Sequence, residues 1–338
     1  MAITIPLRRG FPVAIRHGSR RCFSSSRNLQ ATWGFIGLGR MGYPMARNLR
    51  AKIPAEDTLF VHDVNTAATK KFLEENPHGV RVADNVREVA EKAETIITSL
   101  PEPQHVKGVY KDMLEPATLL TDGFVNTERL FIDCSTIDPM TSGAVADMAH
   151  STGQGKFIDA PMSGGVVGAQ AGTLTFMIGA APEVVQKATG VLSFMGRRVL
   201  HLGGQGAGLK GKLANNYLLA LNNVATAEAM SMGIKWGLDP KALAGMINTA
   251  TGKCWPSEVN NPVPGVVEGS PASRDYEGGF GLALANKDLK LALKAAAEAD
   301  VKLAMGESAR AVYDAAERDE NCKDKDFSVI YRFLGGKE

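Results

Sequence analysis

The strongest constraint on the fold is a strand, a glycine turn and a helix that follow one another within residues 32–51. The run TWGFI at residues 32–36 has the aromatic and β-branched composition of a strand. It leads into Gly37-Leu38-Gly39-Arg40-Met41-Gly42, which has the spacing GxGxxG, and a helical pattern continues to Ala51. The first glycine permits a tight turn, the second lets the backbone approach a pyrophosphate, and the third lets the helix pack on the strand. Residues 37–42 are therefore predicted to bind a dinucleotide at the N-terminus of the helix.

Alternating strand and helix patterns continue after this turn. Apolar runs of strand length lie at residues 58–63, 95–100, 130–135 and 156–161, with helical patterns between them. This alternation predicts the α/β class, with an N-terminal Rossmann-type, doubly wound parallel sheet that carries helices on both faces. No strand pattern occurs from Gly208 onward, so an all-helical C-terminal domain is expected. The predicted boundaries are a leader over residues 1–30, a nucleotide-binding domain over 31–202 and a helical domain over 203–338.

The helical domain is predicted to begin with one long helix. Residues 212–237 form an uninterrupted helical pattern, ~39 Å long at 1.5 Å per residue, which Gly237 ends. Asp239-Pro240 has the form of an N-cap followed by proline at the first helical position. Two further helices are expected at 284–300 and 303–319.

The leader differs sharply in charge from the rest of the chain. Residues 1–30 contain six arginines and no acidic residue, and they end near Ser24-Ser25-Ser26. This composition is typical of a mitochondrial transit peptide, and Arg21-Cys22-Phe23-Ser24 resembles a matrix-protease cleavage pattern. A disordered basic tail is the alternative. Without these six charges the net charge of +2 becomes −4 for residues 31–338, which gives no electrostatic indication of nucleic-acid binding.

The cysteines and histidines are scattered along the chain. Cys22, Cys134, Cys254 and Cys322 form no CxxC pair, and no HExxH pattern occurs. The sequence therefore predicts neither a disulfide framework nor a metal site. No apolar run is long enough to span a membrane, and no membrane association is expected.

Asp63 is the predicted determinant of cofactor choice. It ends the second predicted strand, 21 residues after Gly42, where an acidic side chain accepts hydrogen bonds from the adenosine ribose. Its charge also repels a 2′-phosphate, and neither Val64 nor Asn65 offers a positive charge to bind one. The expected cofactor is NAD rather than NADP. An aspartate that only forms a turn at the strand end is the alternative.

Other small or polar residues end the later predicted strands. Leu100-Pro101 and Ser135-Thr136 lie at carboxyl ends, where open α/β sheets bind their ligands, so they are candidates to line the nicotinamide ribose. Ser163-Gly164-Gly165 offers one hydroxyl and several backbone N–H groups, which suits a small carboxylate. Ordinary turns are the alternative at all these positions.

One of two neighbouring lysines is a candidate acid–base group. On a helix Lys212 has Asn216 at i+4 on the same face, whereas Lys210 has only Ala214 there. An amine whose pKa is lowered by burial and nearby positive charge can take a proton from a substrate hydroxyl and return it. From the spacing alone, two solvated lysines at the start of a helix remain the alternative.

Four stretches together resemble the 3-hydroxyacid dehydrogenase family. They are GFIGLGRMGYPMARNL, DAPMSGGVVGAQAGTLTFMIG, KLANN and GFGLALANKDLKLA, which occur in the family's order, and the resemblance extends over residues 33–335. It implies that Lys212 is the catalytic lysine, that Asn216 assists it and binds substrate, and that Ser163, Gly164 and Gly165 hold the substrate carboxylate. It also implies cofactor contacts for Leu100, Pro101, Thr136, Phe280 and Lys287.

The resemblance further implies an activity and an assembly. We expect NAD-dependent oxidation of the primary alcohol of 3-hydroxyisobutyrate, a step of valine breakdown, in the mitochondrial matrix by a homodimer or homotetramer. The alternatives are an NADPH-linked reductase of a related semialdehyde or glyoxylate, and a non-enzymatic nuclear relative that lacks the lysine. Oxidation of 6-phosphogluconate would require a larger helical domain and basic residues that bind phosphate.

Three residues depart from the family pattern. Met162 replaces a usual valine, and Gly211 before Lys212 is expected to loosen the start of the helix. His105 stands where an asparagine that touches the cofactor is common, which puts that contact in doubt.

Overall fold

Most of the strands belong to one sheet that begins with the predicted glycine-turn strand. The computed structural model describes residues 30–115 and 128–337, so the predicted leader, except for Gln30, lies outside the described residues. Within them the strands are β1 (Thr32–Ile36), β2 (Thr58–His62), β3 (Val80–Val82), β4 (Thr95–Thr98), β5 (Leu130–Asp133), β6 (Lys156–Asp159), β7 (Met162–Ser163), β8 (Leu174–Gly179) and β9 (Gly196–Gly203).

The sheet is parallel over most of its width. The strand order is β3-β2-β1-β4-β5-β6-β8-β7, and β9 pairs with β8 beside this path. All neighbours from β3 to β6 run parallel, which confirms the predicted Rossmann-type α/β architecture. The sheet departs from this parallel arrangement at β8, which pairs antiparallel with β6 and β7. The chain reaches β8 through β7 and one short helix, and it returns in the opposite direction.

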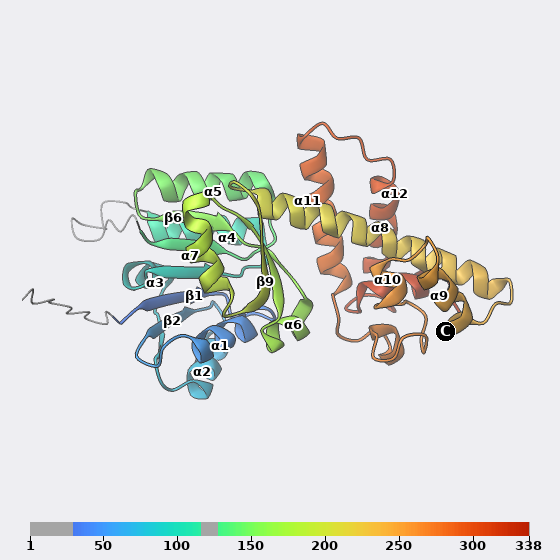
Figure 1. Cartoon of the computed structure of the whole chain (residues 1–338), viewed down its shortest axis with the longest axis horizontal. Coiled ribbons are helices and arrows are strands. Elements are labelled where there is room, and N and C mark those ends of the chain that lie inside the picture. Colours follow the sequence, from blue (N-terminus) through green and yellow to red (C-terminus); the bar gives the residue numbers. More distant parts are fainter. Residues whose placement is uncertain (1–29, 116–127, 338) are drawn as a thin grey trace, which may run out of the picture. The chain divides into compact units, whose positions relative to one another are not determined.

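The helices alternate with strands up to β9 and then follow one another (Figure 1). Those interleaved with the sheet are α1 (Gly42–Lys52), α2 (Thr66–Glu75), α3 (Val86–Lys92), α4 (Pro103–Leu114), α5 (Pro139–Ser151), α6 (Gly165–Ala171) and α7 (Pro182–Leu192). Those of the helical part are α8 (Ala207–Lys235), α9 (Pro240–Thr249), α10 (Trp255–Glu258), α11 (Leu282–Glu298), α12 (Gly306–Arg318) and α13 (Ile330–Phe333), with 3-10 helices at Pro271–Arg274 and Phe327–Val329. The predicted helical C-terminal part is thereby confirmed.

The long helix α8 begins before the position that its sequence pattern predicts. It starts at Ala207 rather than Lys212, because the buried carboxylate of Asp159 at the end of β6 accepts hydrogen bonds from the N–H groups of Gly206 (2.6 Å) and Leu209 (2.8 Å). These bonds satisfy donors that a helix N-terminus otherwise leaves unpaired. Burial raises the pKa of Asp159 to about 6, against the hydrogen bonds that lower it.

The end of α8 and the start of α9 follow the predicted signals. Gly237 adopts φ +92° and ends the helix, as predicted, because the left-handed region suits glycine. Asp239 caps α9 through a hydrogen bond from the N–H of Ala242 (2.8 Å), and Pro240 is the first helical residue.

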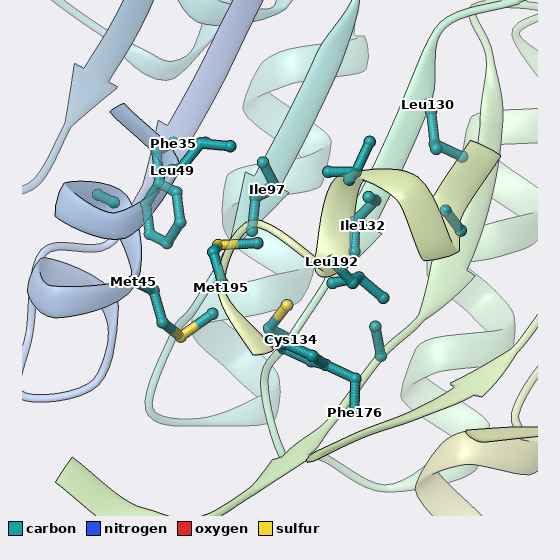
Figure 2. Packing of buried hydrophobic residues seen from close by; sticks show 14 of the residues in the cluster. Phe35, Met45, Leu49, Ile97, Leu130, Ile132, Cys134, Phe176, Leu192 and Met195 are labelled. Carbon is teal, nitrogen blue, oxygen red and sulfur yellow. The ribbon is translucent and has the colours of Figure 1, made fainter. Parts of the chain in front are cut away.

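Two sets of buried side chains form the cores. In the sheet region Phe35, Met45, Leu49, Ile132 and Leu192 pack together between strands and helices (Figure 2), and a second cluster lies among α3, α4 and α5. A third cluster joins α8, α9, α11 and α12. We propose the division into residues 31–202 and 203–338 on this basis, with the first turn of α8 packed in the sheet-region core.

Two glycines in helices should respond oppositely to alanine. A Cβ on Gly208 would collide with the Met177 carbonyl oxygen and lie 2.8 Å from Asp159 Oδ2, whereas a Cβ on Gly245 in α9 meets nothing within 4 Å. Gly208→Ala should therefore lower the free energy of unfolding by about 1–3 kcal/mol through overpacking. Gly245→Ala should raise it by about 0.5–1 kcal/mol through reduced chain entropy. Urea denaturation measures the free energy of unfolding of both variants. A change in the same direction for both would contradict the packing at Gly208 and Gly245.

Candidate functional site

The glycine turn joins β1 to α1 with the predicted geometry. Gly37 adopts φ +97°, and a Cβ there would collide with the carbonyl oxygen of Ser99 at the end of β4. A Cβ on Gly42 would collide with the carbonyl oxygen of Gly37. Both positions therefore require glycine for the strand, turn and helix to pack this closely.

The same turn leaves room for an anionic ligand. Gly39 is exposed, and a Cβ there would meet nothing within 4 Å. No side chain caps the N-terminus of α1, and the N–H of its first residue, Gly42, remains available to an anion. The cradle at Gly37–Gly42 thus fits the pyrophosphate of a dinucleotide, which the sequence predicted here.

Asp63 lies directly after β2 and contacts the glycine turn. Its Oδ2 accepts a hydrogen bond from the N–H of Leu38 (2.5 Å), and its Oδ1 accepts one from the N–H of Asn65 (2.7 Å). The carboxylate therefore stabilises the turn and remains half-buried beside it. Val64 next to it is 96% exposed, which leaves an apolar surface at this edge of the sheet.

A buried polar network joins the ends of β4 and β5. The N–H of Leu100 donates to Ser135 Oγ (2.9 Å), and Ser135 Oγ donates to Asp133 Oδ1 (2.6 Å). The Thr98 hydroxyl also donates to Asp133 Oδ1 (2.7 Å), and burial raises the pKa of Asp133. The structure thus brings together the two strand ends that the sequence proposed for the nicotinamide side.

Lys287 reaches this edge of the sheet from α11. Its ammonium donates to the carbonyl oxygens of Pro101 (3.1 Å) and Thr136 (2.7 Å). Lys287 therefore directly contacts two other residues that are predicted to contact the cofactor. Lys294, two turns further along α11, lies 3.7 Å from Asp138 Oδ1.

Lys212 and Asn216 lie one turn apart on α8, and both are buried at 8% and 5% exposure. Asn216 Nδ2 donates to Asp288 Oδ2 (2.6 Å), and Asn215 Nδ2 donates to Asn216 Oδ1 (3.1 Å). Within the described residues no hydrogen bond or ion pair engages the Lys212 amine. An amine in this setting is available to a ligand.

The surroundings of Lys212 favour its neutral form. Burial lowers the pKa of Lys212 from its usual value; the charge of Asp288 opposes this, and that of Lys287 lowers the pKa further. Lys210, by contrast, is exposed. The structure therefore supplies for Lys212 the buried environment that acid–base chemistry requires, and it leaves Lys210 in solvent.

Gly211 does not loosen the start of the helix, contrary to the sequence prediction. The helix is continuous through it, and a Cβ at this position would collide with Leu202 Cδ1 on β9. The absence of a side chain lets α8 pack against β9. Gly211 therefore permits close packing beside Lys212.

Phe280 lies beside Asn216 in the helical part. The two residues line a small pocket together with Leu219, Ala220, Ala285, Tyr313 and Phe327. The rings of Phe280 and Phe327 meet edge to face, with centroids 5.8 Å apart. An aromatic wall thus adjoins the buried amide.

The Ser-Gly-Gly segment lies where β7 gives way to α6. Ser163 ends β7, and Gly164 and Gly165 adopt φ +131° and +61° at the start of the helix. Both glycines are exposed, so a ligand can reach this segment. No hydrogen bond within the described part of the chain joins this segment to Lys212.

Two aspartates of the site were not proposed from the sequence. Asp288 follows Lys287 directly and binds Asn216 across 72 residues, and Asp133 is the last residue of β5. In the sequence, Asp288 is marked only by its position next to the proposed Lys287, and Asp133 only by its position at the end of a predicted strand. His105 is exposed on α4, and Met162 is half-buried on β7.

The described residues, 30–115 and 128–337, contain no group of three or more His, Cys, Asp or Glu side chains placed to hold a metal ion. In the same residues no helix has both the length and the apolar character to cross a membrane.

The dinucleotide cradle and the buried lysine–amide pair together define a class of dehydrogenases with nicotinamide cofactors. Residues 32–203 match the family model described as the NAD binding domain of 6-phosphogluconate dehydrogenase. Residues 206–334 match the model described as NAD-binding of NADP-dependent 3-hydroxyisobutyrate dehydrogenase. NAD(P)-binding domains are thus present over most of the chain.

Full-length relatives carry one name. The probable mitochondrial 3-hydroxyisobutyrate dehydrogenase of Dictyostelium discoideum is 43% identical over 308 residues, 90% of each chain. The mitochondrial 3-hydroxyisobutyrate dehydrogenase of Bos taurus is 39% identical over 348 residues, which cover 100% of this chain and 99% of the relative. A solved structure of the Mycobacterium tuberculosis 3-hydroxyisobutyrate dehydrogenase with L-serine is 36% identical, with a TM-score of 0.82 over 90% of this chain and 99% of that one. The chain belongs to the 3-hydroxyisobutyrate dehydrogenase family and is an oxidoreductase.

Proposed function

We propose that this chain oxidises the primary alcohol of 3-hydroxyisobutyrate to methylmalonate semialdehyde with NAD, a step of valine breakdown. The observation that carries the proposal is the buried amine of Lys212, one turn from Asn216 and without a protein partner among the described residues. The family relationship supplies the substrate. When bound, the nicotinamide cofactor accepts the hydride from the alcohol carbon.

Lys212 would serve as the general base of this reaction. Its neutral amine takes the proton of the substrate hydroxyl during oxidation, and its ammonium returns a proton during reduction. Asn216 would hold the substrate oxygen beside the amine, while Asp288 fixes the amide by accepting its N–H. Ser163, Gly164 and Gly165 would bind the substrate carboxylate through the serine hydroxyl and backbone N–H groups.

The residues of the glycine turn would hold the cofactor. The N–H groups of residues 39–42 would bind the pyrophosphate, because those of Gly37 and Leu38 already donate to His62 and Asp63. Asp63 would accept hydrogen bonds from the adenosine ribose. Leu100, Pro101, Thr136, Phe280 and Lys287 would surround the nicotinamide end. The charge of Asp63 favours NAD, although the family model for the C-terminal part is described as NADP-dependent.

Initial rates of residues 31–338 with a panel of small 3-hydroxy acids test the proposed function. Each acid is offered with NAD and with NADP, and each semialdehyde and glyoxylate is offered with the reduced cofactors. The highest kcat/KM should be found for 3-hydroxyisobutyrate with NAD. A higher value for glyoxylate or another semialdehyde with NADPH would support the alternative reductase instead.

The rate of alcohol oxidation should rise with pH through a single ionisation of Lys212, since only the neutral amine is a base. Its pKa should lie below the ordinary value of about 10.4. The charge of Lys287 lowers this pKa and that of Asp288 raises it. Lys287→Met should therefore move the rise in kcat to higher pH, and Asp288→Asn should move it to lower pH. Profiles of kcat at saturating cofactor measure both shifts, and a shift in the same direction for both variants would exclude Lys212 as the titrating group.

The helical part would also form a subunit contact. Four large apolar side chains near the end of α8 and in α9 are about half exposed or more. They are Met232 at 48%, Trp236 at 72%, Leu238 at 49% and Met246 at 54%. A surface of this kind favours association with a second copy of the chain. Sedimentation of residues 31–338 at micromolar concentration should show a dimer or tetramer. A monomer throughout that range would contradict this assembly.

The expected location is the mitochondrial matrix. The relatives from Dictyostelium discoideum and Bos taurus are named mitochondrial, which supports the organelle. The arginine-rich, acid-free composition of residues 1–30 supports import into the matrix.

A further inference from the structure

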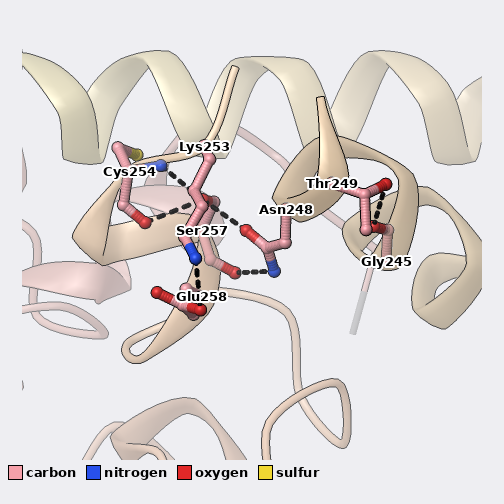
Figure 3. Close-up of polar contacts among 7 residues, drawn as sticks. All are labelled: Gly245, Asn248, Thr249, Lys253, Cys254, Ser257 and Glu258. Carbon is pink, nitrogen blue, oxygen red and sulfur yellow. Dashed lines mark hydrogen bonds and ion pairs between the residues drawn. The ribbon is translucent and has the colours of Figure 1, made fainter. Parts of the chain in front are cut away.

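An irregular segment of the helical part ends at the aromatic residue beside Asn216. Residues 259–281 connect α10 to α11 and contain only one 3-10 helix, Pro271–Arg274. The helix before the segment is fixed to α9: Asn248 Nδ2 donates to the Ser257 carbonyl (3.1 Å), and Ser257 Oγ donates to Asn248 Oδ1 (2.7 Å; Figure 3). Phe280 lies at the other end, where little regular structure holds it.

One carboxylate contacts both ends of this segment. Asp326, near the C-terminus, is 1% exposed. Its Oδ1 accepts a hydrogen bond from Asn260 Nδ2 (3.0 Å), and its Oδ2 accepts one from the N–H of Phe280 (2.7 Å). The two oxygens thus hold the beginning and the end of the segment together.

The backbone around Asp326 adds to this attachment. The N–H of Asp326 donates to the carbonyl of Tyr276 (2.7 Å), and the N–H of Phe327 donates to the carbonyl of Phe280 (2.9 Å). Gly279 has φ +61°, and a Cβ there would collide with Asp326 Oδ2. The carboxylate therefore fits against the backbone on both sides of the Phe280 N–H.

The attachment determines where the aromatic wall lies. Phe280 and Phe327 meet edge to face and line the pocket that contains Asn216. Phe280 is bonded to the carboxylate of Asp326, and Phe327 is its neighbour in the chain. A shift of Asp326 would therefore move both rings relative to Asn216.

We propose that Asp326 is a positioning residue that fixes Phe280 against Asn216 and so sets the position of the aromatic wall beside the amide that is proposed to bind substrate. This inference rests on the proposed function, because that function makes Asn216 part of the substrate site. Asp326 itself touches no reacting atom; it acts through the N–H of Phe280 and the segment that ends there.

Amide hydrogen exchange tests the attachment without any substrate. Asp326→Asn replaces one acceptor oxygen by a donor, so the amides of residues 276–282 should exchange about tenfold faster or more, as expected for loss of a charged hydrogen bond. The matched control is Asp275→Asn, in the same segment. Asp275 bonds Lys325 and Arg332 Nη2 (2.6 Å) but not Phe280, and its φ of +54° suits asparagine. Equal protection of residues 276–282 in wild type and Asp326→Asn would overturn the inference.

Kinetics test the consequence for the pocket. Asp326→Asn should raise the KM of the hydroxy acid about tenfold through misplacement of Phe280. If Asp326 acts through Phe280, the same substitution in a Phe280→Ala background should change KM less than about twofold, because the effects of coupled residues do not add. Fully additive effects on KM would overturn the inference.

A second variant keeps the inference testable if Asp326→Asn does not fold. Gly279→Ala places a methyl group against Asp326 Oδ2 while it keeps the carboxylate, and it should give the same pattern of exchange and KM. Unchanged exchange in this variant would also overturn the inference. A failure of the proposed function can be distinguished from a failure of this inference. If the substrate panel shows no oxidation of 3-hydroxyisobutyrate, the proposed function is wrong. The exchange experiment still decides whether Asp326 positions Phe280.

Discussion

Lys212→Ala should lower kcat by about 10²–10⁴, the range found for general acid–base groups. The substitution removes the buried amine that lies one turn from Asn216 on α8, so the proposed base is lost. The affinity for NAD should change little, because the glycine turn and Asp63 are proposed to bind the distant end of the cofactor. Stopped-flow or steady-state rates give kcat, and fluorescence titration with NADH gives the affinity.

Lys210→Ala is the matched control for this prediction. Lys210 lies two residues earlier on the same helix, but it is exposed, so its loss should leave kcat nearly unchanged. Asn216→Ala should fall between the two, because the base remains while the substrate oxygen loses a partner. An inactive Lys210 variant beside an active Lys212 variant would refute the assignment of the base.

The second large effect concerns the cofactor: kcat/KM should favour NAD over NADP at least tenfold, or ~1.4 kcal/mol. The 2′-phosphate of NADP would meet the carboxylate of Asp63, and no arginine at positions 64 or 65 offsets the repulsion. Asp63→Asn should reduce the ratio of kcat/KM for NAD to kcat/KM for NADP, because it removes the negative charge that repels the 2′-phosphate. The asparagine keeps an oxygen that can accept from the N–H of Leu38. Initial rates with both cofactors measure the ratio. Equal use of NAD and NADP by the wild type would rule out this role for Asp63.

The sequence predicted the fold well where local signals are strong. The glycine turn, the parallel strands β1, β2, β4, β5 and β6, and the caps at Gly237 and Asp239 follow from side-chain size, backbone freedom and capping chemistry, all of which act within a few residues. The start of α8 was misplaced because its cap is not local: the carboxylate that accepts from Leu209 lies 50 residues earlier, at Asp159.

The missed strands lack a strand pattern of their own. β3 has only three residues, and β9 alternates poorly because most of its side chains are exposed. β8 is apolar, but no strand was predicted at its position. Pairing with β6 and β9 stabilises β8 as a strand, and such pairing depends on tertiary structure.

In the candidate site, too, local features could be predicted from the sequence and long-range contacts could not. The spacing of Lys212 and Asn216 on one helix face is a local property, and the structure buries both. Lys287 contacts Thr136 across 151 residues, and its position there had been suggested only by family resemblance. Asp288 and Asp326 were missed as functional residues because nothing near them in sequence indicates which amide or N–H group each carboxylate will meet.

The continuity of α8 has a consequence for how the molecule unfolds. Leu209 at one end belongs to a sheet-region core, and Ala220, Ala227 and Met230 further along belong to the helical core. A single helix of 29 residues joins them, so melting either core removes support from a helix that the other core needs. The two regions should therefore unfold in one cooperative transition rather than in succession. Lys212 and Asn216 lie on the stretch between the two cores, so the geometry of the proposed base is lost in the same event that dissolves either core.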